Sequence, residues 1–94
     1  MHHLFMQEVI SRTLDPNAPV EEQDAYELCL SESDSQFVVS LTYIAWSEID
    51  RQMMCEGYEP QYFDTLEQAR MRYEACRRTI AERGFIYSDM DPIL

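Results

Sequence analysis

The chain has 94 residues, of which 46% are hydrophobic, so we expect a single acidic domain with one core over residues 1–94. Eighteen acidic residues against seven arginines, with no lysine, give it a formal net charge of −11. This charge argues against direct binding of nucleic acid or of an anionic membrane, because both need cationic side chains that face phosphates.

The acidic residues are concentrated in the first 69 residues. That part carries 14 acidic side chains and only two arginines, Arg12 and Arg51, whereas residues 70–94 carry five arginines and four acids. The domain is therefore expected to present a negative surface on the elements that come before its C-terminal part.

The three cysteines, Cys29, Cys55 and Cys76, are too few and too widely spaced for a disulfide framework. The first residues lack the cationic start and long apolar stretch of a signal peptide, and no run is apolar enough for a transmembrane helix. We therefore expect a protein of a reducing compartment, the cytoplasm.

The N-terminal segment, residues 4–14, has two interpretations. Its apolar residues recur at spacings of three and four, which favours a short helix, and a strand is the alternative. Asp15–Pro19 ends the element with two prolines and turn-forming residues. The acidic run Glu21–Asp24 then predicts a solvated connector, which is also able to face a partner.

A β-hairpin is predicted over residues 25–46. Tyr26, Leu28 and Leu30 alternate with polar or small residues, the pattern of a strand with one face on a core. Ser31–Ser35 is short and polar and predicts the loop. The second strand, from Gln36, places five residues on one face: Phe37, Val39, Leu41, Tyr43 and Ala45.

Residues 47–55 are ambiguous in the same way as the N-terminal segment. Ser47 with Asp50 is able to cap a short helix that ends at Gly57, and the alternative is a strand that continues into a bend. Tyr58–Phe63 is expected to be extended, because Pro60 disfavours helix before it and the aromatic residues suit an edge strand.

A long helix over residues 65–83 is the clearest element. Asp64 as N-cap with Glu67 predicts a capping box, and Gly84 predicts the left-handed stop. Phe85–Tyr87 predicts a short last strand and Ser88–Pro92 a tail. The expected fold is α+β: a small antiparallel sheet, made of the hairpin and edge strands, packed on this helix.

Catalytic and metal sites are not indicated. The two histidines, His2 and His3, lie at the N-terminus, and no pair of histidines or cysteines has the spacing of a structural metal site. A pair of carboxylates that acts as general acid and base is harder to exclude, because acidic residues are abundant. For the same reason, any one pair is weak evidence of catalysis. The sequence therefore predicts no enzyme, no bound metal and no cofactor.

The interaction hypothesis rests on aromatic residues that lie among acids. Such residues contribute large contact areas at protein interfaces. An alternative is that Trp46 and Phe63 anchor the core while the acids keep the protein soluble. The predicted partner-binding residues are Glu32, Asp34, Trp46, Glu48, Asp50, Glu56, Tyr58, Glu59 and Tyr62.

This pattern predicts a small protein-binding module that docks on a protein with a basic surface. The expected role is an inhibitor or regulator of a nucleic-acid-handling protein, such as a counter-defence protein of a phage or mobile element of the anti-CRISPR or anti-restriction type. Alternatives are an immunity or antitoxin protein, or a homodimer or small subunit that pairs through a strand edge or the Met53–Met54 region.

Overall fold

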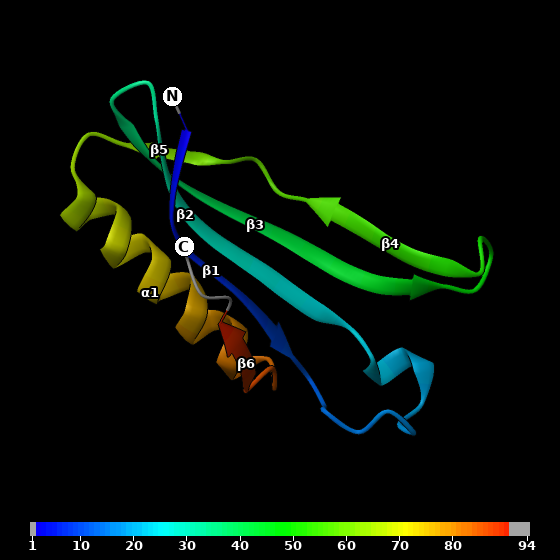
Figure 1. Cartoon of the computed structure of the whole chain (residues 1–94). Coiled ribbons are helices and arrows are strands. Elements are labelled where there is room, and N and C mark those ends of the chain that lie inside the picture. The colour runs from blue at the N-terminus through cyan, green and yellow to red at the C-terminus, as the bar shows by residue number, and fades with distance from the viewer. Residues whose placement is uncertain (1, 91–94) are drawn as a thin grey trace.

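The computed structural model describes residues 2–90, which form a six-stranded antiparallel sheet with one long helix on one of its faces (Figure 1). The α+β prediction is therefore confirmed. The elements are β1 (His2–Ser11), the 3₁₀ turn η1 (Val20–Glu22), β2 (Ala25–Ser33), β3 (Gln36–Ser47), β4 (Gln52–Gly57), β5 (Gln61–Phe63), α1 (Leu66–Glu82) and β6 (Tyr87–Met90).

The strands are ordered β4-β3-β2-β1-β6, and β5 also pairs with β3. β4 and β5 lie along the same side of β3, with β4 beside Thr42–Ser47 and β5 beside Phe37–Val39. After β5 the chain crosses the sheet as α1 and returns as β6, antiparallel to the far end of β1. One sheet edge is therefore formed by β4 and β5 in succession.

The core lies between α1 and one face of the sheet. Its centre is a cluster of Leu28, Leu30, Val39, Ala69 and Tyr73, with Phe37 and Leu41 packed against it. A second cluster, under the C-terminal end of the helix, consists of Ile10, Tyr26, Ile80 and Phe85. The inward residues predicted for the hairpin therefore do face the helix, except that Ala45 lies beyond these clusters.

The bounds of α1 follow from its caps. Thr65, not Asp64, is the N-cap: its Oγ1 accepts a hydrogen bond from the Gln68 backbone N–H at 3.2 Å. The predicted cap was wrong by one residue. Gly84 has a φ of 94° and ends the helix as predicted, with its N–H donating to Ala81 and the Phe85 N–H donating to Ile80. These are the two hydrogen bonds of a Schellman motif.

The helix predicted over residues 4–14 is wrong, because this segment is the strand β1. It pairs with β2 along its whole length and with β6 at its C-terminal end. A bulge between Leu4 and Met6 shifts the register, so that neighbouring residues Phe5 and Met6 both pack against the core. At this bulge the strict alternation of apolar residues that is typical of a strand is lost.

The helix preferred for residues 47–55 is also wrong. Ser47 Oγ does accept a hydrogen bond from the Asp50 backbone N–H, at 3.2 Å, but the chain then reverses at Arg51, which has a φ of 52°. It returns as β4, paired with β3. The hydrogen bond between Ser47 and Asp50 thus stabilises a four-residue hairpin turn instead of the first turn of a helix.

Three shorter segments also differ from the prediction. The β2–β3 turn is only Asp34 and Ser35, both with positive φ as in a type I′ turn, so the predicted five-residue loop belongs mostly to β2. The last strand begins at Tyr87, and Phe85 is buried in the core instead. The predicted tail is strand as far as Met90, while Asp91 and Pro92 lie outside the described residues.

The helix is too short to cover the longest strand. At about 1.5 Å per residue α1 spans roughly 25 Å, whereas β3 at about 3.3 Å per residue spans roughly 40 Å. The molecule measures 42 × 25 × 25 Å accordingly. The end of the β3–β4 hairpin extends past the helix in Figure 1. We call residues 44–55 the arm, and the sheet face opposite α1 the open face.

Candidate functional site

The arm carries large apolar side chains that remain exposed. Trp46 and Met53 are paired across β3 and β4 on the open face and are 36% and 48% exposed. Met54 pairs with Ala45 on the other face and is 43% exposed. All residues of β4 are exposed, because Met53 and Cys55 are on the face opposite α1 and the helix ends before it reaches the arm on its own face. The arm is therefore an apolar ribbon without a covering layer in residues 2–90.

The tip of the arm adds negative charge to this apolar surface. Ile49 is 94% exposed at the turn, between the exposed acids Glu48 and Asp50. Asp50 is held by Ser47, whose hydroxyl donates to the carboxylate at 3.3 Å. The tip thus presents an isoleucine flanked by two carboxylates.

The outer edge of β4 has backbone groups without a strand partner among residues 2–90. The Tyr58 N–H donates to the Leu41 carbonyl at 2.9 Å, which makes these two residues a hydrogen-bonded pair. Because such pairs alternate along an antiparallel ladder, Glu56, Met54 and Gln52 also direct their backbone groups toward β3. Those of Met53, Cys55 and Gly57 consequently point outward.

The open face continues from the arm over the body of the sheet with little charge. Glu27 accepts a hydrogen bond from Gln7 at 3.1 Å, and burial, followed by the nearby Glu27 charge, raises the pKa of the Cys29 thiol. A shallow hollow of about 340 Å³ lies at the end remote from the arm and is lined by Leu4, Cys29, Ser31, Ser33, Val38, Ser40, Pro60 and Tyr62.

A groove lined by two arginines and one acid, Arg72, Arg83 and Glu59, lies on the other face, between α1 and the β4–β5 bend at the base of the arm. Two adjoining hollows of about 210 and 260 Å³ share Leu41, Tyr58, Arg72 and Cys76 as lining residues. Arg72 donates to the Gln61 side chain at 2.6 Å. Neither Arg72 nor Arg83, at the far end of the groove, has a carboxylate partner among the ion pairs within residues 2–90. We call this the Arg72 groove.

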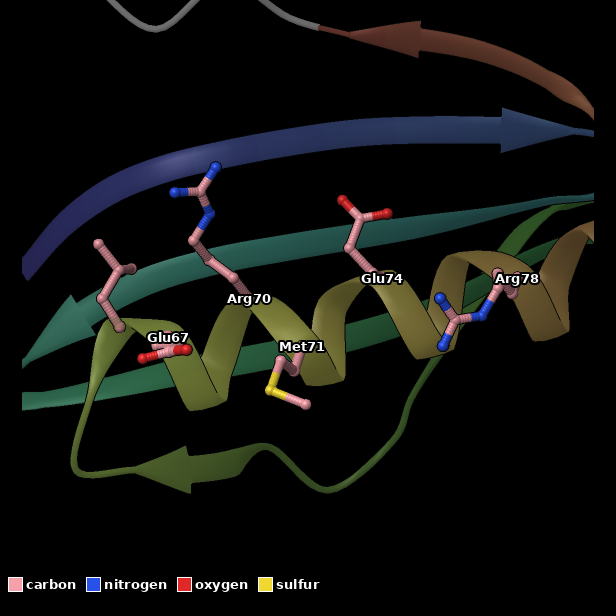
Figure 2. A pocket seen from close by; sticks show the side chains of 6 residues that line it. Glu67, Arg70, Met71, Glu74 and Arg78 are labelled. Atoms are coloured by element: carbon pink, nitrogen blue, oxygen red, sulfur yellow. The ribbon is translucent and has the colours of Figure 1, made fainter.

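The outer surface of α1 has a different character. Its hollow of about 530 Å³ is lined by side chains from one helix alone, among them Glu67, Arg70, Met71, Glu74 and Arg78 (Figure 2). Arg70 and Glu74 point to one side of the helix, and Met71 points to the other. Opposite charges alternate at spacings of three and four, as on a solvated helix surface. This surface lacks a second wall and is not a candidate site.

The predicted partner-binding residues lie in three places. Trp46, Glu48 and Asp50 are on the arm and its tip. Asp34 is in the β2–β3 turn, at the opposite end of the hairpin, with Glu32 beside it on the helix side. The remaining four follow the β4–β5 edge: Glu56, Tyr58, Glu59 and Tyr62. The acids and aromatics thus follow one edge of the sheet and both ends of its central hairpin.

Of the two residues predicted alternatively as core anchors, only Phe63 packs against the core. Trp46 is on the arm, away from both core clusters. The two faces of the sheet separate them, because Phe63 pairs with Phe37 on the helix side whereas Trp46 is on the open face.

Two acids outside the predicted partner-binding set, Glu8 and Asp24, are buried. Glu8 is 0% exposed and accepts hydrogen bonds from the hydroxyls of Tyr73, at 2.8 Å, and Ser88. Arg77 Nε lies 3.3 Å from the same carboxylate. Burial, together with the Glu8 contact, raises the pKa of Tyr73 far above its usual value. Glu8 alternates with Met6 and Ile10, so an interpretation of this segment as a strand would have placed it inside.

Asp24, predicted in a solvated connector, is 3% exposed, and that part of the prediction is wrong. Two Arg12 nitrogens donate to its carboxylate, each at 2.9 Å, and the Tyr43 hydroxyl donates at 2.5 Å. Burial acts to raise the pKa of Asp24, but these bonds outweigh it and the pKa is lowered. Asp24 and Glu8 are thus buried acids with partly exposed arginine partners, Arg12 and Arg77, and add little to the surface charge.

Comparisons with known proteins give no further guide. No family model matches the chain, and neither the curated proteins nor the solved structures that were searched contain a match. Within residues 2–90, no cluster of three histidine, cysteine or acidic side chains is arranged to hold a metal ion. The one helix of this part is too short and too polar to cross a membrane.

Proposed function

We propose that this chain is a protein-binding module that docks its arm and the adjoining open face on a protein with a basic surface. The observation that carries the proposal is the exposed Trp46–Met53 pair on the open face of the arm, the face opposite α1. Tryptophan and methionine are enriched in the centres of interfaces, where they fill partner pockets. A monomer that kept this pair only for its own stability would gain more by burying it.

The carboxylates around this pair support a basic partner. Glu48 and Asp50 flank the tip, and Glu56 and Glu59 follow along the edge of the sheet. These acids have no ion pair among residues 2–90, unlike the buried acids Glu8 and Asp24. Carboxylates displayed in this way speed association with a positive surface and are able to take the place of phosphates on it.

The role that fits this chemistry is an inhibitor or regulator that occupies the nucleic-acid-binding surface of its partner. Counter-defence proteins of phages and mobile elements, directed against CRISPR or restriction enzymes, are one class with this role. The function needs no catalytic group, cofactor or metal in the chain, and the open face and arm supply contact area instead.

Capture of partners from native host cells tests the proposal. We expect the wild-type protein to retain a nucleic-acid-binding protein, and E48R/D50R or W46S to reduce the retained amount at least about tenfold, since one hot-spot side chain is worth about 2 kcal/mol or more. The matched control is Met71→Ser, which removes an exposed apolar side chain from the outer surface of α1. Equal capture by W46S and M71S would refute the arm as the binding surface.

A further inference from the structure

The end of the Arg72 groove that is formed by Arg83 gathers hydrogen-bond donors without an acceptor among residues 2–90. Tyr26 is only 6% exposed, and it lines the hollow of about 210 Å³. Its hydroxyl accepts a hydrogen bond from Arg83 Nη1 at 2.9 Å, and no residue of this part of the chain accepts the hydroxyl proton itself. The Nε and Nη2 groups of Arg83 have no acceptor there either. Because polar groups of buried side chains normally have partners, this end of the groove offers a place for an acceptor from outside the chain.

The walls between this end and Arg72 are mostly apolar. Leu41 comes from the sheet, Cys76 and the buried Ile80 come from α1, and Tyr58 comes from the bend after β4. The adjoining hollow of about 260 Å³ continues the same space. Taken together, the two hollows fall within the roughly 300–1,000 Å³ of small-molecule sites. The groove is thus an apolar slot with convergent donors at one end.

The Arg72 end of the slot favours a different chemical group. Arg72 Nε donates to the Gln61 side chain at 2.6 Å, which fixes the guanidinium at the slot. A guanidinium fixed in this way is able to stack on an aromatic ring. Glu59 lines the slot only at this end, where its charge opposes a second anion. The slot therefore favours a ligand with one anionic end and one neutral aromatic end.

We propose that the Arg72 groove binds a small aromatic carboxylate. The carboxylate accepts hydrogen bonds from Tyr26 and Arg83 and supplies the acceptor that both side chains lack. Such bonds are about twice as strong as neutral ones, because the acceptor is charged. The aromatic ring lies on Leu41 and Cys76, with Arg72 stacked on it. The groove and the open face lie on opposite sides of the sheet, so this inference does not depend on the proposed function.

Titration with phenylacetate and with its neutral analogue phenylacetamide tests the carboxylate contact by NMR of the arginine Nε–H groups. We expect millimolar phenylacetate to shift the signals of Arg72 and Arg83 and to bind at least about tenfold more tightly than the amide, because only the anion forms charge-assisted hydrogen bonds. In R83Q this preference should be lost. The matched control is Arg78→Gln, which removes the same charge from the outer surface of α1 and should keep the preference.

Two further variants separate the ends of the ligand. Y26F removes the hydroxyl proton and should weaken phenylacetate alone, whereas R72Q removes the ring contact and should weaken both compounds. Circular dichroism confirms that each variant is folded. Three results would overturn the proposal: arginine signals that do not shift, equal binding of anion and amide by the wild type, or R78Q that binds as weakly as R83Q.

Capture of the protein partner by R83Q distinguishes this site from the proposed arm contact. If R83Q loses phenylacetate and still retains the partner, the groove and the arm are separate sites. Loss of the partner as well would assign the groove to the protein contact and overturn the small-molecule site.

Discussion

The two ends of β3 lie in different surroundings, although they belong to one strand. Val39 is in the main core cluster under α1, whereas Trp46 lies on the arm, where nothing in residues 2–90 covers it. The first end gains its stability from layers that exclude water, and the second end forms only a two-stranded ribbon. Such ribbons are marginal on their own. The body therefore holds the fold, and the arm is free to serve a contact.

The largest loss of unfolding free energy is expected for a substitution in the core of the body. Leu28→Ala removes a fully buried side chain from the main cluster and should lower the free energy of unfolding by about 2–5 kcal/mol. Leu14→Ala is the matched control, because Leu14 is exposed, and should change it by less than about 0.5 kcal/mol. Urea unfolding followed by circular dichroism measures both. Similar losses would mean that the core is not where the structure places it.

The buried acid is the next test of the body. Glu8→Ala removes the acceptor shared by Tyr73, Ser88 and Arg77, and should cost about 1–3 kcal/mol of unfolding free energy because a buried hydroxyl loses its partner. Glu74→Ala removes an exposed carboxylate from α1 and serves as control. If both variants unfold at the same urea concentration, the Glu8 network does not stabilise the fold.

Tyr43 and Asp24 form a hydrogen bond where the body meets the arm. This bond should make the stability of the fold depend on pH. The bond to Asp24, with burial, raises the pKa of Tyr43 from 10.0 to about 12. A raised pKa means stabilisation that is full below pH 10 and is lost as the pH rises toward 12. Y43F should cost about 1 kcal/mol at neutral pH and should flatten this alkaline loss.

Asp24 in the same cluster should make the fold less stable at acidic pH. The pKa of Asp24 is lowered from 3.8, so its contribution is present above that pH and is lost as the pH falls through the lowered value. Thermal unfolding of the wild type and of Asp24→Asn from pH 2 to 7 measures it. A stability difference between the two proteins that stays constant over this range would contradict the assignment.

The smallest effect on stability is expected in the arm. Met53→Ser and Ile49→Ser replace exposed side chains that no core cluster includes, and each should change the unfolding free energy by less than about 0.5 kcal/mol. The denaturant midpoints of these two variants are measured and compared with that of Leu28→Ala. A loss above about 2 kcal/mol would show that the arm packs against something within the chain.

The sequence predicted the body better than the arm, for physical reasons. Alternation over Tyr26–Leu30 and the Gly84 stop are local signals, and both hold. The β1 bulge and the Ser47 turn imitate helical signals, and strand pairing overrides them. Local patterns do not contain this pairing, since it depends on residues distant in the chain.

The candidate site was predictable only as a set of residue types. Tryptophan and tyrosines among acids are typical of interfaces, but whether Trp46 is in the core or exposed depends on which face of the sheet α1 covers, and Trp46 is on the opposite face. The burial of Asp24 likewise depends on Arg12 and Tyr43, which come from two other segments. The Arg72 groove joins a helix to a bend more than ten residues away, and no motif marks it.

Amide hydrogen exchange in dilute protein is the most direct test of the division into a stable body and an uncovered arm. At low concentration we expect the outward amides of Met53 and Cys55 to exchange orders of magnitude faster than that of Leu28. Arm amides that exchange as slowly as that of Leu28 would show that the arm is as stable as the body.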